Sequence, residues 1–184
     1  MRICGRRHLL AGHGQGHAMK IKKSSRHTKI TGDFGESLVL YWLSKYGFEC
    51  VPVDHTGIDI LARNPHTSEL MGISVKSRCR NPGKESSDIM VRNEHLDQVS
   101  SACKTFDCEP YFAFVVDAGQ RIMAFILSQR HLLKLSPKKR VNAGWKMTEK
   151  HLQLYAQDPD IVSFSFNSIS GNWWAKLDSG SKQL

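Results

Sequence analysis

Four polar residues have types and positions that could do chemistry together: Glu36, Asp59, Ser74 and Lys76. Asp59 lies in a run over 58–63 that is typical of a β-strand, and Ser74 and Lys76 lie in a second such run over 70–79. Alternation along a strand puts Ser74 and Lys76 on one face, and it puts Asp59 on the face opposite its apolar neighbours Ile58, Ile60 and Ala62. If the two strands are antiparallel neighbours, the three polar side chains meet on one side of the sheet.

A carboxylate on one strand beside a lysine on the next is suited to phosphodiester hydrolysis. Mg²⁺ prefers carboxylates, waters and phosphate oxygens as ligands, and it polarises a phosphate while lowering the pKa of a bound water. A lysine beside the ion can orient or deprotonate that water and offset developing negative charge. Glu36 would add a second carboxylate from the first turn of a predicted helix, although an acid there also simply complements the helix dipole.

The elements that must position these residues follow from the spacing of apolar side chains. Helical spacing predicts a helix over 33–46, which Gly47 ends. Strands are predicted over 48–53, 58–63 and 70–79, and the short turns between them favour an antiparallel meander.

The second half of the chain adds a crossover to a buried strand. Its predicted elements are an extended segment at 88–92, a helix capped by Asn93, strands at 111–116 and 122–127, a helix near 148–157 and a strand at 161–166. The apolar side of the helix after Asn93 holds Leu96, Val99, Cys103 and Phe106. We therefore predict the α/β class, with a mixed central sheet flanked by helices.

These residues give the sequence a resemblance to the PD-(D/E)xK nuclease superfamily, and within it to archaeal Holliday-junction resolvases and some restriction-type nucleases. The resemblance covers residues 32–118 and rests on Gly35-Glu36, on Leu43 with Gly47-Phe48, on GIDILA at 57–62 and on ISVKS at 73–77. It implies a restriction-endonuclease-like α-β-β-β-α-β core. It also implies hydrolysis of DNA, including branched or structured DNA, with Mg²⁺ or Mn²⁺ as cofactor.

The resemblance also implies roles for individual residues. Asp59 is similar to the metal-binding aspartate of the family, Lys76 to its catalytic lysine, and Glu36 to the helix glutamate of resolvase-like members. The Val75 carbonyl would be a further metal ligand. Many members work as dimers, so a homodimer is a further expectation.

Ser74 departs from the family pattern, which has an acid or Gln two residues before the lysine. A hydroxyl is a weaker ligand for Mg²⁺ than a carboxylate, and it removes a negative charge from the site. Metal binding could then depend on Asp59 and Glu36, with Ser74 contributing a hydroxyl or binding through water. Alternatively, the enzyme is weak, or the chain is a catalytically degenerate nucleic-acid-binding module. No histidine is recognisable as a base for Ser74, and His55 in the preceding turn is a distant candidate.

Several basic residues near these positions are candidates for contacts to DNA phosphates: Arg78, Arg80, Lys84 and Arg92. A solvated loop is the other interpretation of the same charges. Gln98 is a further candidate site residue on the second predicted helix. The basic segment 138–140 is interpreted as a solvated turn or a phosphate contact, and Trp173-Trp174 as terminal packing or base stacking.

The charge of the chain is unevenly distributed. Its 184 residues include 26 Lys and Arg and 17 Asp and Glu, for a formal net charge of +9. Residues 1–31 hold eight of these basic residues and no acid, so the rest of the chain is close to neutral. We predict a flexible basic arm or leader over 1–31, one nuclease-like domain over 32–170 and a tail over 171–184.

Composition excludes several other classes of protein. No apolar run approaches the roughly 20 residues that span a bilayer, and the basic N-terminus lacks the apolar stretch of a signal peptide. The five cysteines contain no Cys-x-x-Cys pair, which argues against a zinc cluster or a disulfide framework. The sequence therefore predicts a cytoplasmic protein with reduced thiols and no membrane association.

Overall fold

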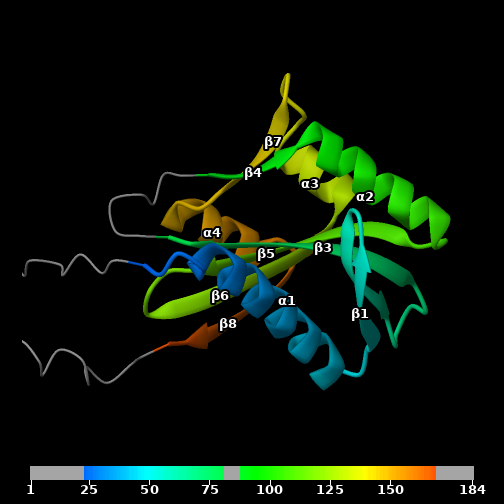
Figure 1. The fold of residues 1–184 in the computed structure, drawn as a ribbon, viewed down its shortest axis with the longest axis horizontal. Coiled ribbons are helices and arrows are strands. Elements are labelled where there is room, and N and C mark those ends of the chain that lie inside the picture. Colours follow the sequence, from blue (N-terminus) through cyan, green and yellow to red (C-terminus); the bar gives the residue numbers. More distant parts are fainter. Residues whose placement is uncertain (1–22, 81–87, 169–184) are drawn as a thin grey trace, which may run out of the picture.

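The computed structural model describes residues 23–80 and 88–168 (Figure 1). In chain order the elements are α1 (His27–Lys45), β1 (Glu49–His55), β2 (Ile58–Arg63), β3 (Leu70–Cys79), β4 (Asp88–Arg92), α2 (Asn93–Thr105), β5 (Glu109–Asp117), β6 (Arg121–Ser128), α3 (Gln129–Leu135), β7 (Asn142–Lys146), α4 (Glu149–Gln157) and β8 (Val162–Asn167). No helix in these two ranges has both the length and the apolarity needed to cross a membrane.

The centre of the fold is a six-stranded sheet with the order β1-β2-β3-β5-β6-β8. The strands β1, β2 and β3 form the predicted antiparallel meander. The next pair, β3 and β5, is parallel, and the chain crosses between these strands through β4 and α2. The remaining pairs are antiparallel. The predicted α/β class with a mixed central sheet is therefore confirmed.

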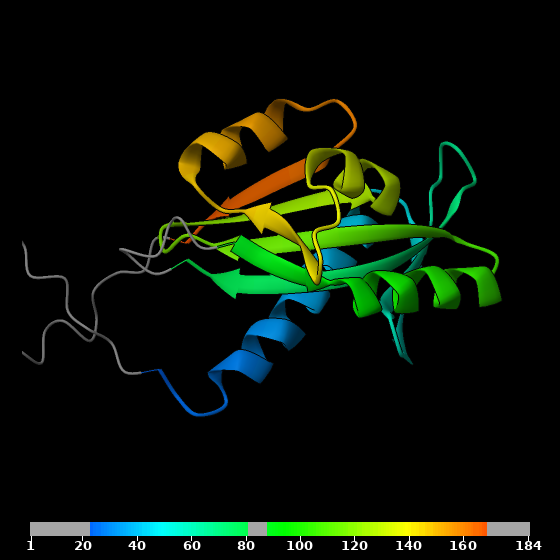
Figure 2. The same ribbon diagram turned by 90° about the horizontal axis from the view of Figure 1, so that it is seen from above.

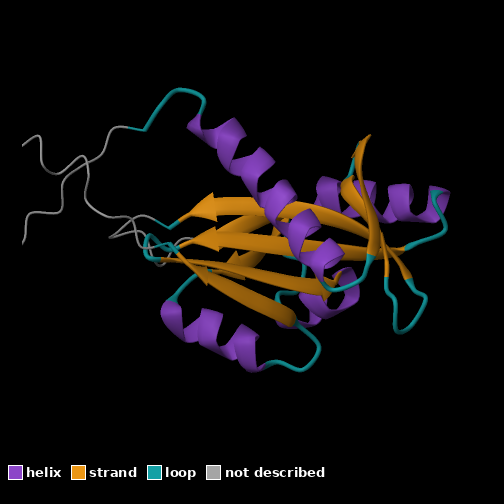
Figure 3. Cartoon of the chain, turned by 90° about the horizontal axis from the view of Figure 1, so that it is seen from below, coloured by secondary structure: helices purple, strands orange, loops and turns teal. Residues whose placement is uncertain are grey.

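Helices cover both faces of this sheet (Figures 2 and 3). On one face, Val39 and Leu43 of α1 pack against a cluster that includes Ile73, Val75 and Val115. On the other face, the buried residues of α2, α3 and α4 pack against Phe112, Phe114 and Val116 of β5. Alternate residues of β5 thus face different helices, which explains why its sequence is continuously apolar.

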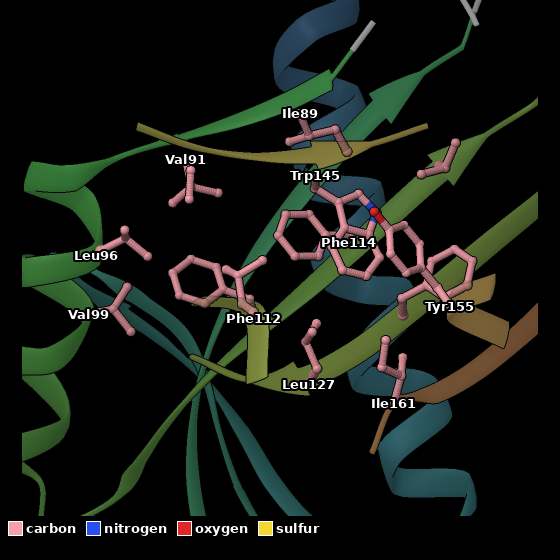
Figure 4. Packing of buried hydrophobic residues seen from close by; sticks show 14 of the residues in the cluster. Ile89, Val91, Leu96, Val99, Phe112, Phe114, Leu127, Trp145, Tyr155 and Ile161 are labelled. Atoms are coloured by element: carbon pink, nitrogen blue, oxygen red, sulfur yellow. The ribbon is translucent and has the colours of Figure 1, made fainter. Parts of the chain in front are cut away.

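The core on the α2 side is centred on aromatic rings (Figure 4). The Trp145 ring, which comes from β7, stacks on Phe114 with ring centroids 4.4 Å apart and on Tyr155 with centroids 3.8 Å apart. Trp145 is 1% exposed. Trp145 belongs to a small second sheet, in which β4 and β7 pair only with each other in the described residues.

The structure differs from the predicted elements at three places. First, α1 begins at His27 and not at Asp33, so the predicted domain boundary at residue 32 falls inside this helix. Residues 27–31 gave no apolar signal because this turn is largely exposed; it is stabilised locally by Lys29, whose Nζ lies 2.9 Å from Asp33. Second, α3 and β7 were not predicted. Third, Asn93 does not cap α2; instead its Nδ2 donates to the carbonyls of residues 139 and 140.

Candidate active site

The candidate site lies where β2 separates from β3. Backbone pairing of these strands runs from Arg63 opposite Leu70 to Ile60 opposite Ile73 and then stops. Beyond this point the Val75 N–H of β3 has a side-chain partner instead of a backbone partner from β2. Asp59 Oδ2 accepts its hydrogen bond at 2.6 Å. β3 continues as far as Cys79 with a described strand partner only on its β5 side.

The bend in β2 at this point changes the expected alternation. Ile58 was predicted to share a face with Ile60 and Ala62, but it packs in the cluster on the α2 side, whereas the other two pack on the α1 side. The preceding Gly57 has φ +106°, and a Cβ there would lie 2.8 Å from the backbone of Gln98 in α2. The turn therefore needs glycine for two reasons, its positive φ and its close contact with α2. This contact places the start of β2 directly against α2.

Ser74 is the centre of a polar network inside the sheet. It is fully buried, and its Oγ lies 3.0 Å from Lys76 Nζ, 3.4 Å from Asp59 Oδ2 and 2.9 Å from His95 Nε2. The structure thus brings three of the four residues singled out in the sequence, Asp59, Ser74 and Lys76, into one cluster. It adds His95, which the sequence analysis did not select.

Lys76 is partly buried, and Ser74 Oγ accepts a hydrogen bond from its ammonium group. Its Nζ also donates to the Val75 carbonyl at 3.2 Å. Burial lowers the pKa of Lys76, and the negative charges of Asp59 and Glu36 oppose this shift. Lys76 Nζ thus has two described oxygen partners, and burial weakens its preference for the charged form.

Glu36 lies in the middle of α1, and not in the first turn as predicted, so it does not serve to complement the helix dipole. Its side chain is exposed, and no described hydrogen bond joins it to the network. Burial of part of the carboxyl group and repulsion by Asp59 raise the pKa of Glu36. The charge of Asp59 therefore acts on Glu36. Gly35 brings the helix to this position, since a Cβ there would overlap Ser77 Oγ of β3.

His95 comes from the first turn of α2 and contacts Ser74 on the face of the sheet that α2 covers. Its ring also packs edge-on against Phe112, with ring centroids 6.1 Å apart. Gln98, the predicted candidate on this helix, is exposed and has no described hydrogen bond to Ser74. His55 plays no part: its Nδ1 lies 2.9 Å from the Thr56 carbonyl and its ring packs on Phe106. The only signal for His95 in the sequence was its spacing from Gln98.

The predicted phosphate-binding residues divide into three groups. Arg78 on β3 and Arg92 before α2 are exposed. Arg80 is not free, because its side chain is 13% exposed and donates to the Met147 carbonyl and to Glu149. Lys84 lies outside the described residues.

The oxygen atoms at Asp59 fit a hard divalent cation. No described hydrogen bond reaches Asp59 Oδ1, whereas Oδ2 binds the N–H of Val75, the residue whose carbonyl was predicted as a ligand. The charge of Asp59 also acts on the Glu36 carboxyl group. Mg²⁺ is commonly held by one or two carboxylates and several waters, which matches this sparse set. The three-residue cluster of metal-ligand type in the described residues lies elsewhere and consists of His131, Asp158 and Asp160. Both ring nitrogens of His131 face carboxylates there, so a single ion could not bind all three through those contacts.

Comparisons with known proteins show a likeness in structure but no match in sequence. No family model matches the chain, and no curated protein is similar to it in sequence. A solved structure of Hjc, a Holliday junction resolvase from the archaeal hyperthermophile Archaeoglobus fulgidus, is similar to this chain with 19% identity and a TM-score of 0.49, covering 67% of this chain and 93% of Hjc.

Proposed function

We propose that this protein is a divalent-metal-dependent phosphodiester hydrolase that acts on DNA. The observation that carries the proposal is the position of Asp59. Its carboxylate lies where the backbone pairing of β2 with β3 ends. Oδ2 accepts a hydrogen bond from the Val75 N–H, and Oδ1 has no hydrogen bond within the described residues. Lys76 lies beside it, with Nζ held by two oxygen atoms.

The residues of the chain would divide the chemistry between them. Asp59 Oδ1, the Val75 carbonyl and Glu36 would hold a divalent cation, Mg²⁺ or Mn²⁺, and Ser74 would contribute a hydroxyl or bind through water. When bound, such a cation supplies charge that polarises a phosphate and acidifies a water molecule. Lys76 would orient the attacking water through Nζ and offset the negative charge that develops on phosphate.

The distribution of basic residues supports a DNA substrate. Arg78 is exposed on the part of β3 that extends past β2, and Arg92, Lys139 and Arg140 are exposed around the start of α2. None of these four takes part in an ion pair within the described residues, so their charges are available for phosphates. Branched DNA and a homodimeric form are extensions of this proposal that derive from the sequence resemblance.

A second candidate is a DNA-binding module that has lost catalysis. The observation that favours it is Ser74, since a neutral and fully buried hydroxyl stands between Asp59 and Lys76. This candidate predicts binding to DNA that weakens with salt, without cleavage.

A single-turnover cleavage assay tests the proposal. Supercoiled plasmid and a four-way junction are incubated with Mg²⁺ or Mn²⁺ and with wild type, Asp59→Asn or Lys76→Gln. Asp54→Asn, an exposed position on β1, is the matched charge control. We expect each site variant to lose at least about 100-fold in rate and the control to retain activity. Cleavage that survives both site variants would contradict the proposal.

A Ser74→Glu variant separates the two candidates. The His95 ring occupies the space next to Ser74, so the variant is made together with His95→Ala, and His95→Ala alone is the control. If only the protein with Glu at position 74 cleaves DNA, the natural site is degenerate and the second candidate is correct.

A further inference from the structure

The Ser74 hydroxyl has one proton and three polar neighbours, of which two could accept that proton. A hydroxyl donates one hydrogen bond and accepts through two lone pairs. Lys76 can only donate, so it occupies a lone pair of Ser74 at 3.0 Å. The hydroxyl proton must then go to Asp59 Oδ2 at 3.4 Å or to His95 Nε2 at 2.9 Å. His95 is the nearer acceptor, and Asp59 Oδ2 already accepts the Val75 N–H at 2.6 Å.

We propose that His95 is a positioning residue of this site: its unprotonated Nε2 accepts the Ser74 proton, which turns a lone pair of Ser74 toward the Lys76 ammonium and fixes that group beside Asp59. This inference rests on the proposed function for its catalytic consequence. Its hydrogen-bond geometry stands independently of that function.

The hydrogen bonds of Ser74 favour the neutral ring that this role requires, because Lys76 already donates to the same oxygen that His95 Nε2 contacts. Burial and the nearby charge of Lys76 lower the pKa of His95, whereas Gln98 and Asp59 act in the opposite direction. A protonated ring would place two cationic donors on the single oxygen of Ser74. With Nε2 as acceptor, the ring proton of neutral His95 lies on Nδ1.

The fold holds His95 in place from two sides. Phe112 of β5 packs edge-on against the ring, and the Gly57 turn lies against the backbone of Gln98 one turn further along α2. The turn that precedes Asp59 and the helix that carries His95 are thus in direct contact. The distance between Asp59 and His95 is therefore set by rigid elements, as a positioning residue needs.

The role of His95 explains how a serine can serve at position 74. A carboxylate there would hold Lys76 by charge, whichever way its oxygens faced. A hydroxyl is neutral and can rotate, so it holds the ammonium only if another group fixes its proton. The Lys76 ammonium is then held by Ser74 Oγ and by the Val75 carbonyl.

Nitrogen NMR of the imidazole ring tests the proton arrangement directly, without metal or DNA. In ¹⁵N-labelled protein at neutral pH, we expect His95 to be neutral, with the proton on Nδ1 and an unprotonated Nε2, and Ser74→Ala to weaken this tautomer bias. The signals are assigned by their loss in His95→Gln. A ring that is protonated on Nε2, or that is an imidazolium, would overturn the proposal.

Cleavage kinetics then separate positioning from packing. His95→Gln keeps an acceptor oxygen near the place of Nε2, whereas His95→Leu fills part of the space without one. We expect His95→Leu to lower kcat about tenfold with KM for DNA unchanged, and His95→Gln to restore most of the rate. Exposed His66→Leu is the matched control and should behave as wild type. Equal rates for His95→Gln and His95→Leu would overturn the proposal.

A double variant adds a test that a purely structural role would not satisfy. Since His95 acts through Ser74, the losses in Ser74→Ala and His95→Leu should not multiply when they are combined. Multiplicative losses would overturn the proposal. If wild type proves not to cleave DNA, the proposed function fails while the NMR result still decides the role of His95.

Discussion

Two glycines of α1 offer a matched test of how this helix is seated on the sheet. Both Gly32 and Gly35 lie within the helix, and neither has a positive φ. A Cβ at Gly32 would meet no atom within 4 Å. A Cβ at Gly35 would overlap Ser77 Oγ and would lie 2.9 Å from Ser77 Cβ, which cannot rotate away. Gly35 therefore sets the distance between α1, which carries Glu36, and β3.

The expected effects on stability follow from two opposing quantities. Replacing glycine by alanine inside a helix stabilises it by about 1 kcal/mol, and this gain is common to both variants. Overpacking at Gly35→Ala costs about 1–3 kcal/mol in addition. We expect Gly32→Ala to be more stable than wild type, and Gly35→Ala to be about 1–3 kcal/mol less stable than Gly32→Ala.

Urea unfolding followed by circular dichroism measures both free energies of unfolding. Adding Ser77→Gly to Gly35→Ala removes both atoms of the clash, so the combined loss should be smaller than the sum of the single losses. If Gly35→Ala proved as stable as Gly32→Ala, the close contact of α1 with β3 would be refuted, and with it the placement of Glu36.

Two further predictions concern the core and the thiols. Trp145→Ala should lower the free energy of unfolding by about 3–5 kcal/mol, and Trp145→Phe by less, because the ring is buried between Phe114 and Tyr155. A loss within error of zero in urea unfolding would contradict the stacked core. Burial raises the pKa of Cys103 to about 12. Iodoacetamide at mildly alkaline pH should therefore alkylate Cys103 far more slowly than the partly exposed Cys50, and mass spectrometry measures the modified fraction at each site. Equal rates would show that Cys103 is accessible as a thiolate.

The strands around the site could be predicted because their signals are local. The bounds of β2 and β3 agree with the predicted ranges, since apolar alternation and short turns define them. The contact of Asp59 with Ser74 follows from the antiparallel pairing of two strands that are adjacent in sequence. The roles assigned to Asp59, Ser74, Lys76 and Glu36 stay predictions.

The features that escaped prediction depend on contacts between distant parts of the chain. His95 reaches Ser74 only because α2 packs on the face of the sheet that carries Ser74, and spacing along α2 does not reveal which strand it faces. Trp145 lies in a short strand whose only described partner, β4, is far away in sequence. Ile58 leaves the expected face because the Gly57 turn bends β2 against α2. No local pattern encodes these tertiary contacts.

The metal site at Asp59 is the central claim, and equilibrium binding of Mn²⁺ tests it most directly. Electron paramagnetic resonance of free Mn²⁺ gives the bound fraction for wild type, Asp59→Asn and the control Asp54→Asn, in the absence of DNA. We predict one bound ion per chain in wild type and in the control, and a loss of affinity of at least about tenfold in Asp59→Asn. Mn²⁺ binding that is equally tight in Asp59→Asn and wild type would contradict the account.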